Sequence, residues 1–205
     1  MSKTKKIAMI LLSILLVGSI TGCGEKKPRF EPLHMSVDGT EILLGEATLQ
    51  TFIDAGYKVT LDRNLKQDIA GGTMPAMTYD VAAYVSKDND IVGMVGFLNN
   101  TKDIIPLEEC IVNEYEIKYK DPSSSASYNT DNILVDGVNL KGMQVEDVKK
   151  AFEGKGEDFK EFENPDGSVG VISFEIDKVN ISVSFDYTTR EATTTDIKIF
   201  LTYFE

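Results

Sequence analysis

The sequence predicts an α+β fold made of two tandem repeats, each with a strand, a short helix and a three-stranded antiparallel meander on which the helix packs. Six segments alternate apolar and polar residues with a period of two, which is typical of antiparallel strands with one buried face. Two short stretches with helical spacing precede these segments, one in each half of the chain, and they resemble each other. A helix lying on one face of such a sheet buries the apolar side of both.

The first half begins, after a polar N-terminal region, with apolar residues on either side of an Asp-Gly turn at 38–39. A helix is predicted next, with Thr48 as its N-cap, apolar residues at Leu49 and Phe52, and Gly56 as its end. The three strands of this half are expected at 79–85, 91–98 and 115–119, and the turn between the first two holds Asp88 and Asp90.

The second half repeats this order about ninety-six residues later. An Asp-Gly turn at 136–137 precedes a helical stripe that starts near Met143 and ends before Gly154. Strands are expected at 172–176, 179–187 and 197–203. The predicted domain boundaries are therefore 33–120 for the first repeat, a serine-rich linker at 121–128, and 129–205 for the second repeat.

The start of the second helix carries a short pattern formed by Gly142, Met143, Glu146 and Val148. It resembles the helix start of small outer-membrane-assembly lipoproteins of the SmpA/OmlA type, and it is similar to the tandem repeats of beta-lactamase-inhibitor-like proteins. The stretch at 48–57 resembles a segment of uncharacterised lipoproteins of Gram-positive type. These resemblances imply a non-enzymatic domain that docks onto a protein or onto the cell wall.

The first 22 residues have the order of a secretory signal peptide. Three lysines within the first six residues are followed by an apolar stretch at 7–17, which a single serine interrupts, and then by small residues. The apolar stretch is too short to span a bilayer comfortably. Residues 1–22 are therefore predicted to be a signal peptide that is removed on export.

A cysteine stands where cleavage of this segment is expected. The pattern there is an aliphatic residue, two small residues and the cysteine, namely Ile20, Thr21, Gly22 and Cys23. It resembles the lipobox of bacterial lipoproteins, which implies lipid transfer to the Cys23 thiol, cleavage before Cys23 and a mature N-terminus acylated with fatty acids such as palmitate. Residues 23–32 would then be a polar tether to the extracytoplasmic face of the cell membrane. The alternative is an ordinary signal peptide that Cys23 follows by chance.

The charge of the chain excludes one class of partner. Removal of residues 1–22 takes away three of the 21 Lys and Arg residues and none of the 33 Asp and Glu residues, which leaves a formal charge of about −15. Phosphate backbones repel such a body, so we expect no nucleic-acid partner, and attachment to the membrane depends on the lipid.

Residues with catalytic or metal-binding chemistry are few. His34 is the only histidine and is expected in a solvated loop, while Cys110 lies between two acids and two aliphatic residues and is expected in the core, without a disulfide. The glycine-rich stretch at 71–75 lacks the lysine of a phosphate loop and is interpreted as a flexible surface loop that is free to contact a partner. No cofactor or metal site is predicted.

Two aromatic residues near the C-terminus are candidate interface residues. Phe200 and Phe204 fall on the opposite parity from Ile199 and Leu201, so they face away from the predicted core side of their strand. The alternatives are that the two repeats pack together there, or that this strand is central and buried on both sides.

Together these patterns predict a membrane-anchored extracytoplasmic lipoprotein of the cell envelope that acts as a non-catalytic protein- or ligand-binding module. Its protein partner is not identified by the sequence. Two alternatives stay open: a cell-envelope hydrolase or accessory that uses surface carboxylates, and a protein inhibitor of a secreted enzyme.

Overall fold

A computed structural model describes residues 33–61, 65–119, 128–186 and 193–201. All of them belong to one compact unit, residues 32–205. Their buried apolar side chains form a single cluster drawn from both halves of the chain. Residues 32–205 therefore contain a complete hydrophobic core of their own.

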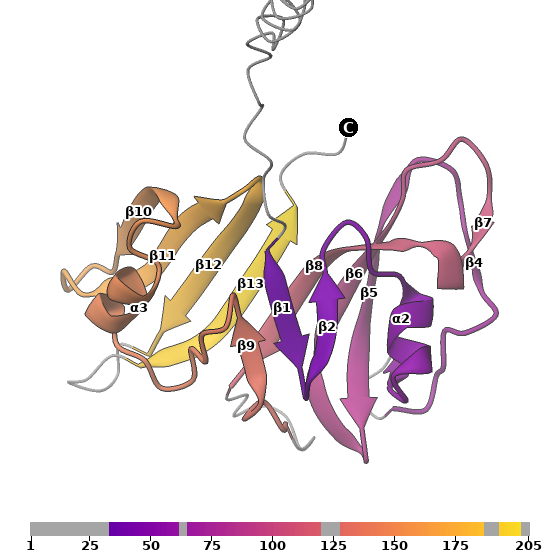
Figure 1. The fold of residues 1–205 in the computed structure, drawn as a ribbon, viewed down its shortest axis with the longest axis horizontal. Helices are drawn as coiled ribbons and strands as arrows, with labels where there is room; N and C mark the ends of the chain where they lie inside the picture. The colour runs from indigo at the N-terminus through magenta and orange to yellow at the C-terminus, as the bar shows by residue number, and fades with distance from the viewer. Residues whose placement is uncertain (1–32, 62–64, 120–127, 187–192, 202–205) are drawn as a thin grey trace, which may run out of the picture. The chain divides into compact units, whose positions relative to one another are not determined.

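The main feature is an eight-stranded sheet in which every neighbouring pair is antiparallel (Figure 1). In order across the sheet the strands are β10 (Glu157–Glu163), β11 (Val169–Ile176), β12 (Val179–Phe185), β13 (Thr194–Leu201), β8 (Ile111–Lys118), β6 (Asp90–Asn99), β5 (Thr78–Lys87) and β3 (Lys58–Thr60). The C-terminal strand β13 thus lies in the middle of the sheet, beside β8 from the first half.

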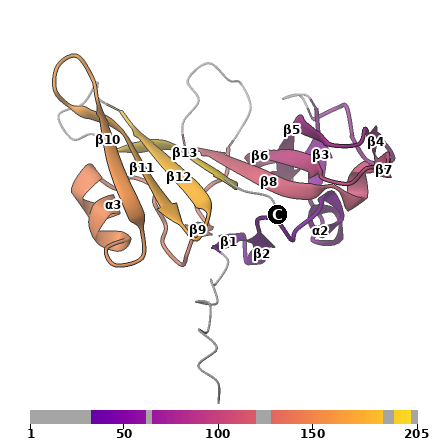
Figure 2. The ribbon, with the colours of Figure 1, turned by 90° about the horizontal axis from the view of Figure 1, so that it is seen from above.

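A second layer covers one face of this sheet. It contains a three-stranded sheet and two short helices: β1 (His34–Val37), β2 (Thr40–Leu43), β9 (Ile133–Val135), α2 (Leu49–Asp54) and α3 (Val145–Ala151). Figure 2 shows these elements on one side of the main sheet. Near one end, the two-residue strands β4 (Thr73–Met74) and β7 (Ile105–Pro106) pair beside the 3-10 turn η1 (Leu107–Glu109).

Alternating burial along the strands defines the two faces of the sheet. In β12, Val179, Ile181, Val183 and Phe185 are buried, while the residues between them are half-buried. In β13, Ile197 and Ile199 point into the same core, and β8 adds Tyr115 and Ile117 opposite them. This apolar face meets the second layer, and within the described residues no helix or strand covers the opposite face, which we call the open face.

The hairpin turns explain why the strands have their register. Residues at both central positions of a type I′ turn need a positive φ, which Asn, Asp and Gly adopt most readily. Asp38 and Gly39 have φ of 46° and 79°, and Asp88 and Asn89 have φ of 53° and 71°. These turns join β1 to β2 and β5 to β6. The predicted turn at residues 88–90 is therefore confirmed as a hairpin turn.

The predicted fold class is wrong. The protein is mainly β, and it does not form two repeats that each consist of a strand, a helix and a three-stranded meander. Strands of both halves join in one sheet, because β8 and β13 pair with each other from Glu114↔Phe200 to Lys118↔Asp196. Each half contributes four strands to the main sheet instead of three, and the helices have only six and seven residues. The predicted helix positions and N-cap Thr48 are confirmed, as are the predicted strand positions within the described ranges.

Candidate functional site

The residues predicted to anchor the protein lie outside the described ranges. These are Ile20, Thr21, Gly22 and Cys23, and Phe204 also lies outside them. Among the described helices none is long and apolar enough to cross a membrane. The anchor at Cys23 therefore stays a prediction.

Phe200 lies on the open face of the main sheet. It is in β13 opposite Asn180 of β12 and Glu114 of β8, and its side chain is half-buried. Of the two alternatives, the strand is indeed central, but Phe200 is not in the core cluster. It stands as an aromatic side chain in the middle strands of a face that carries no covering element among the described residues.

Polar side chains surround Phe200 and are paired across the strands of the open face. Lys198 Nζ lies 2.8 Å from Glu114 Oε1, and Ser184 Oγ donates to Asp196 Oδ1 at 2.8 Å. Further from the centre, Ser173 Oγ donates to Asn180 Oδ1 at 3.1 Å. The open face therefore combines a central aromatic with small hydroxyl side chains and the ion pair of Lys198 with Glu114.

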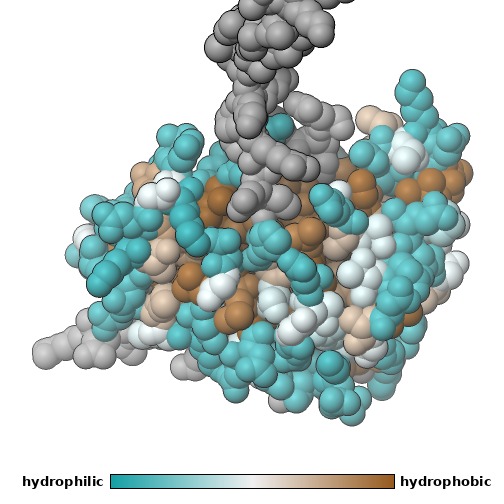
Figure 3. Space-filling view, viewed as in Figure 1, coloured by the Kyte–Doolittle hydropathy of each residue, from teal (hydrophilic) through white to brown (hydrophobic). Residues whose placement is uncertain are grey.

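The most exposed large apolar side chains of the described residues occur at one end of the sheet. Met77, Tyr79 and Ile104 expose 69%, 72% and 70% of their surface. Met77 and Tyr79 belong to the chain entering β5, and Ile104 precedes β7. Figure 3 shows hydrophobic surface at the end that carries β4 and β7. We call these three residues the apolar tip.

Asn99 fixes the two loops of the apolar tip to each other. It is fully buried at the end of β6, and its Nδ2 lies within 3.1 Å of Met74 O, 2.8 Å of Pro75 O and 2.8 Å of Asp103 O. Its Oδ1 accepts hydrogen bonds from the backbone N and the hydroxyl of Thr101 at 2.9 and 2.7 Å. One side chain thus holds the segments on both sides of the tip in a defined geometry.

The stretch at 71–75, interpreted as a flexible loop, is partly ordered by this arrangement. Met74 is buried and pairs with Ile105, and Gly72 O accepts a hydrogen bond from Leu107 N at 3.0 Å. The expectation of a surface loop is correct only for the residues that flank β4. The apolar tip was not predicted from the sequence. A signal for it was the presence of apolar residues in two turn-rich segments, Met74 and Met77 in one and Ile104 and Ile105 in the other.

A cleft of about 560 Å³ lies between α3 and β10. Phe159 forms an apolar wall and stacks on Phe174 with ring centroids 4.8 Å apart. Lys149 Nζ lies between Glu146 and Glu161, at 3.1 and 2.5 Å, and these two hydrogen bonds raise the pKa of Lys149. The charge of Lys149 is thus balanced by these two carboxylates, and the cleft is lined mainly by charged side chains of both signs.

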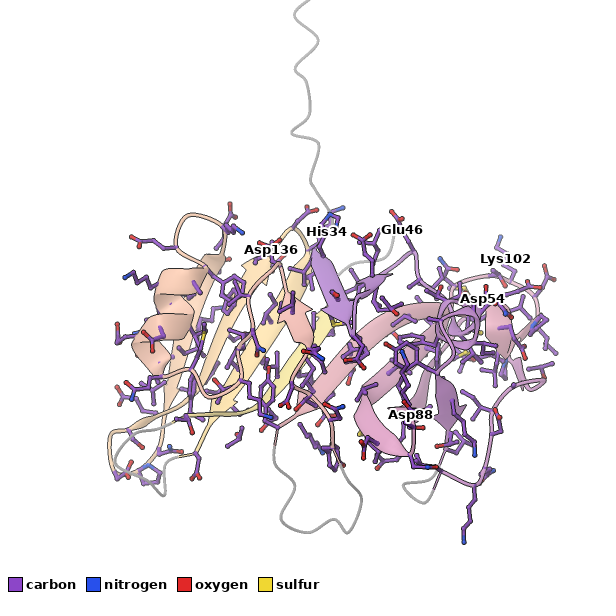
Figure 4. The ribbon with its side chains drawn as sticks, turned by 60° about the horizontal axis from the view of Figure 1, so that its bottom comes forward. His34, Glu46, Asp54, Asp88, Lys102 and Asp136 are labelled. Atoms are coloured by element: carbon purple, nitrogen blue, oxygen red, sulfur yellow. The ribbon has the colours of Figure 1, made fainter. Side chains whose placement is uncertain are left out.

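The other candidate residues do not form a catalytic arrangement within the described part of the chain. Cys110 is buried, and burial together with Glu108 and Glu109 raises the pKa of its thiol, which disfavours the reactive thiolate. His34 is exposed and its Nδ1 lies 2.5 Å from Glu41 Oε1. The charged residues labelled in Figure 4 are spread from β1 to the end near Lys102 instead of meeting in one cavity.

Metal ligands are also not gathered there: among the described residues no group of three or more His, Cys, Asp or Glu side chains could hold a metal ion. Comparison of the chain with protein-family models, with curated proteins and with solved structures finds no match in any of the three. A functional argument for this protein therefore depends on its own sequence and surfaces.

Proposed function

We propose that this protein is a lipoprotein held to the extracytoplasmic face of the cell membrane by lipid on Cys23, and that its domain binds another protein without catalysis. The lipobox pattern at 20–23 supports the anchor. The open face of the main sheet supports the binding role, with Phe200 as its central side chain. No nucleic acid is expected as a partner, because the mature chain is strongly acidic.

The dimensions of the open face suit a protein partner. Eight strands at a spacing of about 4.8 Å give a width of about 34 Å, and seven residues per strand give a length of about 24 Å. The resulting area of about 800 Å² is what one partner contributes to an interface of standard size. A half-buried aromatic near the centre, ringed by hydroxyls and paired charges, matches the usual division into an apolar centre and a polar rim.

The catalytic alternative has less support than the binding role. A glycosidic or hydrolytic site needs an acid, a base or a nucleophile at mutual hydrogen-bonding reach. Several of the described carboxylates contact lysines, hydroxyls or backbone groups on separate elements. An inhibitor of a secreted enzyme would also use a broad surface such as the open face, so it is one form of the proposed binding role.

The proposal is tested by site-specific photocrosslinking in native membranes. A photoreactive phenylalanine analogue replaces Phe200 in the full-length protein, and a control carries it at Gln50, which is exposed on α2 in the layer on the other side of the sheet. We expect a discrete protein adduct from position 200 only, and its loss when an excess of unlabelled residues 32–205 is added. Equal adducts from both positions, or none from position 200, would contradict the binding role.

The anchor is tested separately by intact mass measurement of the protein from the same membranes, beside a Cys23→Ala variant. We expect a mature chain that begins at an acylated Cys23, and a variant that is not acylated. An unmodified cysteine in the wild type would remove the lipoprotein proposal and leave the test of the open face unaffected.

A further inference from the structure

The apolar tip is a rigid feature that the proposed binding role does not use. It lies on the loops next to β4 and β7 and on the first residues of β5, at one end of the main sheet, whereas Phe200 is in the middle of the sheet. Met77 N donates to Thr101 O at 3.0 Å, and Asn99 links Pro75 to Asp103. These bonds hold the chain at Met77 against the loop that leads to Ile104.

Large apolar side chains that are this exposed are expected to be covered by another molecule. Met77, Tyr79 and Ile104 each expose about 70% of a large side chain, so together they offer about 400 Å² of mostly apolar surface. A stable protein interface buries about 800 Å² on each partner. The tip alone is therefore too small to hold a second copy of the chain or another folded protein.

Insertion into a lipid bilayer does not require such an area. Two aliphatic side chains and a tyrosine, whose ring is apolar and whose hydroxyl is polar, are the composition that stabilises proteins at the boundary between headgroups and acyl chains. Lys102 projects at the same end (Figure 4) and is followed by Asp103, so the loop carries little net charge. The charge of this loop thus does not oppose contact with a zwitterionic membrane surface.

The anchor would bring the bilayer within reach. Residues 23–32 span at most about 35 Å when extended, so lipid on Cys23 keeps the domain within that distance of the membrane. A contact that is weak for a free domain becomes effective when a tether holds the two surfaces at a high local concentration.

We propose that the apolar tip formed by Met77, Tyr79 and Ile104 inserts into the interfacial region of the same lipid bilayer that holds the anchor. This inference rests on the lipid anchor of the proposed function. It gives the domain a second attachment point to the membrane and thereby fixes the direction in which the open face is presented.

The absence of tryptophan from the sequence provides a clean assay, since any introduced tryptophan is the only one. Full-length lipidated Ile104→Trp protein is reconstituted into phosphatidylcholine vesicles whose acyl chains are either brominated or not. Phe162→Trp serves as the matched control, because Phe162 is 55% exposed on β10, at the opposite edge of the sheet. We expect brominated lipid to reduce the tryptophan emission of the Ile104→Trp protein about two-fold and to leave that of the Phe162→Trp protein unchanged, as contact with the upper acyl chain requires.

Further measurements separate the alternatives. Because insertion is apolar, the quenching should persist in 0.5 M salt, whereas an electrostatic contact would be lost. Unquenched emission of the Ile104→Trp protein, when it is shown to be acylated and vesicle-bound, would overturn the inference and leave the anchor intact. A blue shift of its emission that depends on the concentration of residues 32–205 without vesicles would overturn it in favour of a second copy.

If the protein is not acylated, the proposed lipid anchor is wrong, and insertion of the tip is then tested with residues 32–205 alone. Residues 32–205 carrying Ile104→Trp are then titrated with the same phosphatidylcholine vesicles. A blue shift with increasing lipid, reduced at least about three-fold in midpoint affinity by Met77→Ser, would support insertion of the tip. No shift at saturating lipid would overturn it.

Discussion

Replacement of Asn99 by alanine should loosen the apolar tip and cost a large share of the stability of the domain. The two Nδ2 hydrogens of Asn99 are shared among three carbonyl oxygens, and Oδ1 accepts two further hydrogen bonds from Thr101. The bond to Met74 O is buried, so its loss leaves an unsatisfied acceptor at a cost of about 1–3 kcal/mol. The other partners can recover bonds to water, and each of those losses costs about 0.5 kcal/mol.

The expected decrease in the free energy of unfolding is therefore about 3–5 kcal/mol, or about 8–15 °C in melting temperature for a domain of this size. Urea unfolding of residues 32–205 measures it, and hydrogen exchange should show faster exchange at residues 74–78 and 101–105 than elsewhere. Asn100→Ala is the matched control, because Asn100 is the exposed neighbour of the same residue type and should change stability by less than about 0.5 kcal/mol. An Asn99→Ala variant as stable as this control would refute the role assigned to Asn99.

Three further predictions concern the core. Gly93→Ala should destabilise the domain by about 1–3 kcal/mol in urea unfolding, because the new Cβ would lie 2.5 Å from the ring of the buried Tyr115. Gly96→Ala should destabilise it less, because its Cβ would lie 3.0 Å from a side chain on the open face. Cys110 should resist maleimide labelling in the folded protein and react in urea, and fast labelling in buffer would contradict its burial. Burial raises the pKa of the Tyr119 phenol, so stability should fall as pH rises above about 10, and this fall should be smaller in Tyr119→Phe.

The strand positions were predictable from the sequence because their signal is local. In β12 and β13, one side of each strand must be apolar to join the core, and this leaves an alternation that can be read directly. β10 was not predicted because it lacks this alternation: all seven of its residues are exposed. Its sequence is dominated by charges, as suits an edge strand that must not pair further.

The pairing of β8 with β13 could not be read from the sequence. Both strands have an ordinary alternating pattern, and nothing in such a pattern specifies which strand lies beside which. The alternation therefore left open whether the two predicted repeats form one sheet or two. The short helices were located correctly. They cover the sheet together with β1, β2 and β9, and the pairing of β1 with β9 also joins distant parts of the chain.

The candidate surfaces were only partly predictable. The outward direction of Phe200 followed from its parity, and the structure places it on the open face. The apolar tip depends on Asn99, whose five contacts join segments up to twenty-five residues away. A single asparagine in a sequence carries no sign of such a role, because most asparagines in turns bond only to their immediate neighbours.

The central position of β13 has a consequence for the order in which the chain can fold. A chain is synthesised from its N-terminus, and Lys118 of β8 has to wait for Asp196, its partner across the sheet, which is made 78 positions later. Until then the first half has an unpaired edge at β8, and the closing of this long loop is slow. The nascent protein is thus kept from completing its sheet until nearly all of it has been made.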